Sequence, residues 1–142
     1  MYLKQLSVFV DNKPGALYAP CSALADAGVN LSTIFLADTK DFGILRIITN
    51  ETEKALTALR ESNFAVKTTN VLAIEIEDVP GALSKILKTM EGKGLNVLYM
   101  YAAMGTSGKP VMIFRFDDAD QALEKLMETD CKIIGADQFF AR

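Results

Sequence analysis

Two short segments of the chain carry the residue types that could contact a ligand, and their sequences are nearly the same. Residues 11–17 read Asp-Asn-Lys-Pro-Gly-Ala-Leu, and residues 77–83 read Glu-Asp-Val-Pro-Gly-Ala-Leu. Glycine lets a backbone turn sharply or approach another group closely, and proline suits the first turn of a helix. Asn12 and Asp78 stand where a side chain can cap the helix that follows. One such segment is typical of a plain strand-to-helix turn, whereas two copies indicate a repeated unit.

The separation of about 66 positions relates other residues as well. It places Gly28 on Gly94 and Asn30 on Asn96. The apolar alternation of Leu6, Val8 and Val10, which is typical of a half-buried strand, recurs at Leu72, Ile74 and Ile76. The chain is therefore predicted to contain two copies of one unit.

The composition narrows the kinds of chemistry to expect. The chain has 142 residues, with half of them apolar and 23% charged, so it is predicted to be globular. It has no histidine, which is the commonest general base and metal ligand. Two distant cysteines, Cys21 and Cys131, cannot form a zinc site by themselves. We therefore expect neither a metal nor another cofactor.

Charge and hydropathy argue against two classes of partner. The net charge of −3 argues against nucleic acid, whose binding favours a basic face. No apolar run is long enough to span a bilayer, and residues 1–5 lack the apolar region of a signal peptide. With its two isolated cysteines, the chain is expected to be a reduced, cytoplasmic protein.

Hydrophobic periodicity predicts the same order of elements in each half, namely strand, helix, strand, strand, helix and strand. In the first half, the expected strands are 2–10, 29–37, 43–49 and 64–68, and the expected helices are 15–27 and 51–61. In the second half, the expected strands are 71–77, 95–103, 110–117 and 131–134, and the expected helices are 81–92 and 118–129. Right-handed crossovers would place both helices of each unit on one face of a four-stranded antiparallel sheet, as in α+β ferredoxin-like βαββαβ units.

The units are expected to meet at a short, tight connection near Thr69-Asn70, which defines domains 1–69 and 70–142. Hairpins are predicted at residues 38–41 and, in a longer glycine-rich form, at 105–110.

Two features within these elements leave alternatives open. Pro20 lies inside the first predicted helix, so we expect a distorted first turn or a helix that properly starts near Pro20. Arg46 and Arg115 are predicted on the third strands, pointing away from the helices. A cross-strand ion pair of Arg115 with Glu75 or Glu77 is the favoured interpretation, and an arginine that awaits a ligand carboxylate is the alternative.

The predicted topology serves many functions, and several classes fit these residues poorly. An RNA-recognition module needs outward aromatics and basic surroundings. A metal-transfer module would carry Cys-x-x-Cys in the first loop, and an acylphosphatase-like enzyme would carry an arginine there. The first loops contain Lys13 and Val79 instead. Cys21 is a conceivable nucleophile, but its helical spacing from Leu17 and Leu24 favours a core thiol.

The two segments, with Gly28-Val29-Asn30-Leu31 and Gly94-Leu95-Asn96-Val97, resemble the ACT domain, a small regulatory module of amino-acid metabolism, in two tandem copies. The resemblance implies that modules pair side by side and bind an amino acid at their interface, held by the first loop and the start of the second strand. The residues that match this pattern are Asn12, Lys13, Pro14, Gly15, Ala16, Leu17, Asn30, Asp78, Val79, Gly81, Ala82, Leu83 and Asn96.

The chemistry of these positions suits a free amino acid. Free N–H groups at a helix N-terminus attract a carboxylate, and an amide side chain can serve both the ammonium and the carboxylate. Asp78 stands where the first copy has Asn12, and it would repel a carboxylate. The two sites are therefore expected to be unequal.

The resemblance implies an amino-acid-binding regulatory protein of amino-acid metabolism that is not an enzyme, and no catalytic domain is expected beyond the two copies. The alternative is a structural or regulatory interaction subunit of an amino-acid-pathway enzyme, with vestigial ligand pockets.

The exposed sheet edges favour a homodimer, with a single chain that satisfies its own edges as the alternative. The strand around Leu98 and Tyr99 is apolar on both faces. In the tail, at least one of Phe139 and Phe140 is expected to dock.

Overall fold

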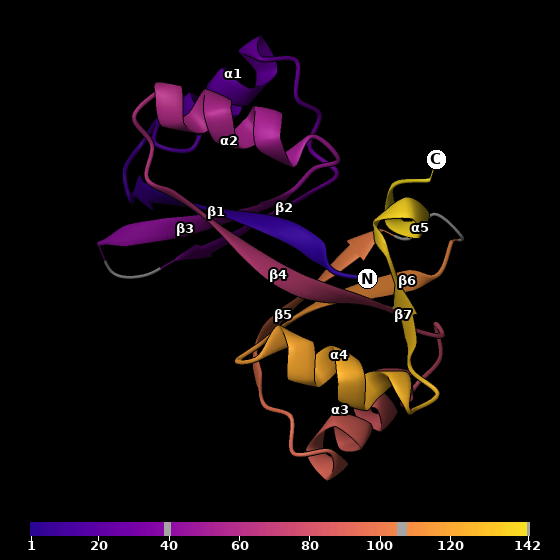
Figure 1. The fold of residues 1–142 in the computed structure, drawn as a ribbon. Coiled ribbons are helices and arrows are strands. Elements are labelled where there is room, and N and C mark those ends of the chain that lie inside the picture. The colour runs from indigo at the N-terminus through magenta and orange to yellow at the C-terminus, as the bar shows by residue number, and fades with distance from the viewer. Residues whose placement is uncertain (39–40, 105–107, 142) are drawn as a thin grey trace. The chain divides into compact units, whose positions relative to one another are not determined.

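The computed structural model describes residues 1–38, 41–104 and 108–141. The chain divides into two compact units. The N-terminal unit comprises Lys4–Thr69, and the C-terminal unit comprises Met1–Leu3 together with Asn70–Arg142. Figure 1 shows helices packed against a sheet in each unit.

The N-terminal unit has the predicted order of elements. Its strands pair antiparallel, with β3 between β2 and β1, and the Phe9 N–H donates to the Ala65 carbonyl at 3.0 Å beside the start of β4. The elements are β1 (Leu3–Asp11), α1 (Tyr18–Asp26), β2 (Thr33–Asp38), β3 (Phe42–Ile48), α2 (Thr52–Glu61) and the first part of β4 (Val66–Glu75).

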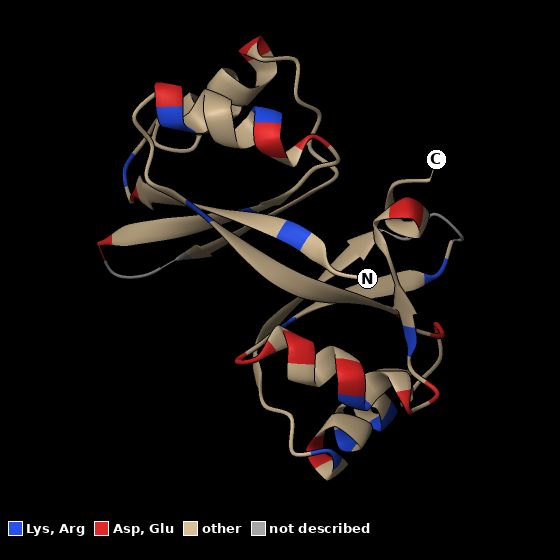
Figure 2. Ribbon diagram, viewed as in Figure 1, with Lys and Arg blue, Asp and Glu red and all other residues tan. Residues whose placement is uncertain are grey.

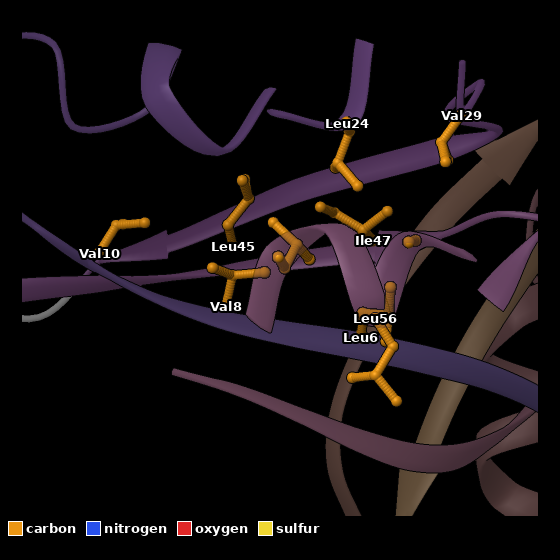
Figure 3. Close-up of a cluster of buried hydrophobic side chains, with 10 residues drawn as sticks. Leu6, Val8, Val10, Leu24, Val29, Leu45, Ile47 and Leu56 are labelled. Atoms are coloured by element: carbon orange, nitrogen blue, oxygen red, sulfur yellow. The ribbon is translucent and has the colours of Figure 1, made fainter. Parts of the chain in front are cut away.

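The core of this unit lies between the sheet and its two helices. The predicted inward face of β1, Leu6, Val8 and Val10, is buried and joins Leu24 and Ile47 in one cluster. Figure 3 shows Leu24 of α1 pointing toward Ile47 of β3. Burying a side chain of this size contributes about 1.5–3 kcal/mol, so this cluster holds α1 and α2 on the sheet.

The C-terminal unit repeats the arrangement. In its antiparallel sheet β6 lies between β5 and β4, and β7 pairs with the other side of β4. The further elements are α3 (Ala82–Gly92), β5 (Val97–Met104), β6 (Pro110–Phe116), α4 (Ala119–Met127), β7 (Lys132–Ile134) and α5 (Ala136–Phe140). Leu72, Ile74 and Met90 pack with Phe114 and Phe116 in its core. Both units are thus ferredoxin-like α+β units, as predicted.

The strands predicted on either side of the expected boundary at Thr69-Asn70 are not separate. Strands 64–68 and 71–77 are one continuous strand, β4, which runs through the expected connection at Thr69-Asn70. The segment contains no glycine or proline that would interrupt a strand, and it is rich in β-branched residues. The turn residues of the two predicted hairpins, 39–40 and 105–107, lie outside the described part of the chain.

The tail forms a short helix that the sequence pattern did not predict. Phe139 on α5 is only 1% exposed, and its ring lies edge-on to Phe140 with centroids 5.1 Å apart. The expectation that at least one of these aromatics docks is confirmed.

The first residues of the chain belong to the C-terminal unit. Tyr2 packs against the core of that unit, and its hydroxyl donates a hydrogen bond to the Asp120 carboxylate on α4. This hydrogen bond, aided by desolvation and by the nearby negative charge, raises the pKa of Tyr2 to about 12. A change at Tyr2 will therefore act on the C-terminal unit.

Candidate functional site

The loop after β1 has the conformation that its glycine predicts. Gly15 has φ +85°, a left-handed backbone that favours glycine. The Ala16 N–H donates to the Lys13 carbonyl at 3.2 Å, and the Ala19 N–H donates to the Gly15 carbonyl at 3.3 Å. A Cβ on Gly15 would meet nothing within 4 Å, so the backbone and not space requires glycine here.

The loop after β4 repeats this geometry. Gly81 has φ +88°, and the space around its Cα is equally open. The Ala82 N–H donates to the Val79 carbonyl at 3.3 Å, and the Lys85 N–H donates to the Gly81 carbonyl at 3.0 Å. Each hydrogen bond has its counterpart 66 positions earlier. The repeated sequence thus encodes a repeated backbone at the N-terminus of each unit's first helix.

The two helices nevertheless start at different points in the repeat. In α1 the first helical residue is Tyr18, whereas α3 begins at Ala82, which corresponds to Ala16. Pro20 is then the third residue of α1, where a backbone N–H needs no helical partner. The expectation that the helix properly starts near Pro20 is confirmed.

This late start changes one predicted contact. Leu17, expected on the buried side of a helix, precedes α1 and is 42% exposed. Its neighbour Tyr18, the first residue of α1, is 75% exposed. The counterpart of Leu17 is Leu83, which lies within α3 and packs against the core of the C-terminal unit. Cys21 packs against the N-terminal core, as a core thiol should.

The far end of each helix also repeats. Gly28, with φ +74°, follows α1, and Val29 donates its N–H to the Leu24 carbonyl at 2.9 Å. Gly94, with φ +70°, follows α3 in the same way, and the Leu95 N–H donates to the Met90 carbonyl at 2.9 Å. These are Schellman helix ends. They explain why β2 and β5 begin later than predicted, since residues 29 and 95 still complete the helix end.

Asn12 and Asn30 lie at opposite ends of the N-terminal unit's sheet. Asp11, directly before Asn12, pairs with Phe42, whereas Thr33, three residues after Asn30, pairs with Ile48 at the other end of β3. At 3.3–3.4 Å per residue, the six steps along β3 from Phe42 to Ile48 separate these ends by about 20 Å. An amino acid is far shorter than this distance.

The C-terminal unit separates its two positions in the same way. Asp78 follows the end of β4 where Glu75 pairs with Val111, and Asn96 precedes Val97, which pairs with Phe116. Neither unit brings its loop residue and its strand-start residue together within itself.

The polar side chains at these positions point to solvent. Asn12, Asn30, Asp78 and Asn96 are exposed, and in the described part of the chain their side chains make no hydrogen bond. The Asn30 carbonyl is held by the Thr49 hydroxyl, which donates at 2.8 Å. The backbone at Asn30 is therefore anchored, while the side-chain amides and the Asp78 carboxylate are available.

A cavity adjoins the first helix of each unit. In the N-terminal unit it has a volume of about 600 Å³, and the predicted site residues Lys13, Pro14, Gly15 and Ala16 form part of its wall. In the C-terminal unit it has a volume of about 420 Å³, and Ala82 is the predicted site residue in its wall. The turns after α2 and α4, residues 63–65 and 128–132, complete these walls. We did not predict these turns as site residues, although they correspond within the repeat.

The predicted pairing of Arg115 with a glutamate does not occur. Glu75 pairs instead with Lys132 at 2.8 Å and Lys109 at 3.9 Å, and Glu77 pairs with Lys109 at 2.9 Å. The hydrogen bond and charge of Glu77, together with the charge of Glu75, raise the pKa of Lys109. Arg115 donates to the Phe116 carbonyl. Lysines near the strand ends reach these carboxylates, and β-strand alternation alone could not distinguish them from the arginine.

Neither a metal-binding cluster nor a membrane-spanning helix occurs among the described residues. Among residues 1–38, 41–104 and 108–141, no group of three or more His, Cys, Asp or Glu side chains could hold a metal ion. In the same residues, no helix is both long and apolar enough to cross a membrane.

Known proteins share this architecture over 89–100% of the chain. Protein BT0572 from Bacteroides thetaiotaomicron is 35% identical, with a TM-score of 0.90 over 100% of this chain and 98% of that one. The regulatory subunit of aspartate kinase from Thermus thermophilus is 17% identical, with a TM-score of 0.62 over 89% of this chain and 91% of that one. Its counterpart from Thermus flavus is 16% identical, with a TM-score of 0.63 and coverages of 90% and 92%. These two share the fold.

No curated protein matches the chain. The family model of the ACT domain pair matches residues 1–141. This match spans both units, with the two glycine loops and the two helix ends described above. The chain belongs to the family of ACT domain pairs.

Proposed function

We propose that this chain is a regulatory module that binds a free amino acid and controls an enzyme of amino-acid metabolism. The observation that carries the proposal is the recurrence of one loop geometry in both units, with Gly15 at φ +85° and Gly81 at φ +88° at the start of a helix. Membership of the ACT domain pair family supports the regulatory, ligand-binding role. The proposed enzyme partner is a kinase such as aspartate kinase, the enzyme stated in the name of the Thermus thermophilus regulatory subunit.

The charged ends of the ligand would be held by helix N–H groups and by side-chain amides. N–H groups in the first turn of a helix lack intrahelical partners and attract a carboxylate. The exposed amides of Asn12, Asn30 and Asn96 can serve the ammonium or the carboxylate. Because Asn12 and Asn30 lie at opposite ends of one sheet, one ligand cannot touch both residues of the same unit. We therefore propose that each site combines the loop of one chain with the strand start of a second copy of the chain.

The two loops are not equivalent toward this ligand. Asp78 takes the place of Asn12, and its carboxylate attracts an ammonium but repels a carboxylate. The loop with Asn12 is thus the stronger candidate for the ligand's carboxylate end.

A thermal-shift screen against the free amino acids tests the proposal. A ligand that binds only the folded chain stabilises it by about 2.7 kcal/mol at one hundred times its dissociation constant. At least one amino acid at millimolar concentration should raise the melting temperature. If none does, the alternative of an interaction subunit with vestigial pockets replaces this proposal.

Isothermal titration of variants then tests the site residues. Asn12→Ala and Asn30→Ala should each weaken binding, and Asp78→Ala should weaken it less. Asn50→Ala is the matched control, because Asn50 is also an exposed asparagine next to a helix but lies outside the proposed site. Equal affinity in all four variants would show that these positions do not hold the ligand.

The proposed site also favours a dimer. The outer strands β2 and β5 expose apolar side chains: Ile34 is 47%, Leu36 is 42% and Leu98 is 48% exposed. Pairing of such an edge with a second copy would cover them. We propose a homodimer, and light scattering at micromolar concentration checks it. A mass near the 15.5 kDa of one chain would contradict it.

A further inference from the structure

The cavity of the C-terminal unit is built within that unit from three elements. The end of β4 forms one wall, α3 forms a second, and the turn between α4 and β7 forms the third. Its volume is about 420 Å³, which is within the range of small-molecule sites. Ile76, Ala82 and Ile86 provide apolar surface between the polar groups.

Two opposite charges in this wall are unpaired within the described part of the chain. Across the described residues, Lys85 on α3 and Asp130 on the α4–β7 turn make no ion pair or side-chain hydrogen bond. Other charges of the wall are engaged: Glu75, with an 8% exposed side chain, pairs with Lys132. Figure 2 shows both signs of charge on α3 and α4. The cavity therefore offers one ammonium and one carboxylate from separate elements.

The repeat supplies an internal comparison. The cavity of the N-terminal unit has the same three walls, yet Ala19 stands in place of Lys85, Asn63 in place of Asp130 and Ala65 in place of Lys132. Figure 2 shows no Lys or Arg on α1, in contrast to α3. The fold itself therefore does not require these charges, because the N-terminal unit forms without them.

We propose that the cavity of the C-terminal unit is a second ligand site, which takes a small zwitterion such as a free amino acid. Lys85 binds the carboxylate of the ligand, Asp130 binds its ammonium group, and Ile76 and Ile86 contact its carbon chain. The site lies wholly within one unit, unlike the shared sites at the loops. This inference rests on the proposed function, because both assign a free amino acid as the ligand.

To test this site, the wild-type chain is titrated with a panel of free L-amino acids. Backbone-amide NMR shifts are then measured with the amino acid that binds. Shifts are expected around Lys85 and across residues 128–132. Lys85→Ala and Asp130→Asn give the cavity the residues of the N-terminal unit, and each should weaken binding at this site about fivefold or more. Lys88→Ala and Glu124→Gln are matched controls, since both residues are exposed on α3 and α4 outside the cavity wall.

Blocked forms of the same amino acid identify the contacts. The α-amide lacks the carboxylate and the N-acetyl form lacks the ammonium, so both should bind wild type more weakly. The penalty for the amide should disappear in Lys85→Ala, and the penalty for the acetyl group should disappear in Asp130→Asn. Both variants should keep the wild-type melting temperature, because Lys85 and Asp130 are exposed and make no ion pair or side-chain hydrogen bond among the described residues.

The outcomes separate this inference from the proposed function. If binding is weakened by Asn12→Ala or Asn30→Ala but is unchanged in Lys85→Ala and Asp130→Asn, the second site is overturned while the proposed function stands. If the cavity variants weaken binding and the loop variants do not, the cavity site stands and the loop sites fall. If no amino acid in the panel binds, both fall.

Discussion

The two units share a backbone but differ in what their cavities present. Positions that set the backbone are kept or replaced by similar residues: the glycines 15 and 81, the helix-end glycines 28 and 94, and the core residues Leu24 and Met90. Positions that face the cavities change character, as when alanine at 19 corresponds to lysine at 85. Cavity-facing residues can diverge because the core and the turns already stabilise the unit.

A second difference lies at the start of the first helix. Pro20 is the third residue of α1, whereas Ile86, at the corresponding position of the repeat, is the fifth residue of α3. The same loop therefore leads into helices that begin two residues apart. Such matched positions give three tests of the comparison, and Tyr2 gives a fourth that concerns the C-terminal unit alone.

Ile86→Pro should destabilise the chain by about 3 kcal/mol or more. The fifth residue of a helix donates its N–H to the first, here Ala82, and proline removes that hydrogen bond. Pro20→Ala in α1 should cost only about 1 kcal/mol, because proline has no N–H to lose and its replacement mainly makes the unfolded chain more flexible. Urea unfolding followed by circular dichroism measures both, and similar losses would contradict the different helix starts.

Gly15→Ala and Gly81→Ala should each cost about 1–2 kcal/mol through left-handed backbone strain alone. The two losses should be equal, because neither added Cβ meets an atom within 4 Å. Gly92→Ala, in the last turn of α3, is the control and should instead stabilise by about 0.5–1 kcal/mol. Unequal costs in urea unfolding at positions 15 and 81 would show that the loops are not equivalent.

Asp118→Ala should cost about 1 kcal/mol, because the Asp118 carboxylate caps α4 by accepting from the Gln121 N–H at 3.0 Å. Glu51, at the same place in α2, makes no side-chain cap hydrogen bond and only an exposed pair with Lys54 at 3.7 Å. Glu51→Ala should therefore cost less than about 0.5 kcal/mol. Thermal unfolding of both variants measures these losses, and Asp118→Asn, which keeps the cap, is the control. Equal losses in Asp118→Ala and Glu51→Ala would contradict the expected difference.

Tyr2 should give the C-terminal unit a small extra pH dependence. Its pKa is about 12 in the folded chain against an ordinary value of 10.0. A raised pKa contributes stability that is fully present below pH 10 and is lost as pH rises toward 12. Tyr2→Phe removes this contribution, so the stability difference between wild type and variant should shrink over this range. A difference that stays constant in urea unfolding from pH 9 to 12 would exclude the Tyr2–Asp120 hydrogen bond as its cause.

The sequence alone determined the repeat, the order of elements and the special loop positions. Alternating apolar residues such as Leu6, Val8 and Val10 encode a one-sided strand, and a glycine after proline encodes a turn into a helix. These signals are local, so they can be read without knowing the rest of the chain. They sufficed for the ferredoxin-like units, for the late start of α1 near Pro20 and for the resemblance to ACT domains.

Only the tertiary structure decided which residues meet. Strand pairing placed Asn12 and Asn30 at opposite ends of one sheet, although the family pattern assigns both to ligand binding. It also brought Lys109 and Lys132 to Glu75, where alternation had suggested Arg115. The cavity charges Lys85 and Asp130 lie 45 positions apart in the sequence and line one cavity only in the folded unit. Contacts of this kind depend on register and on the reach of long side chains, and neither is encoded in a local pattern.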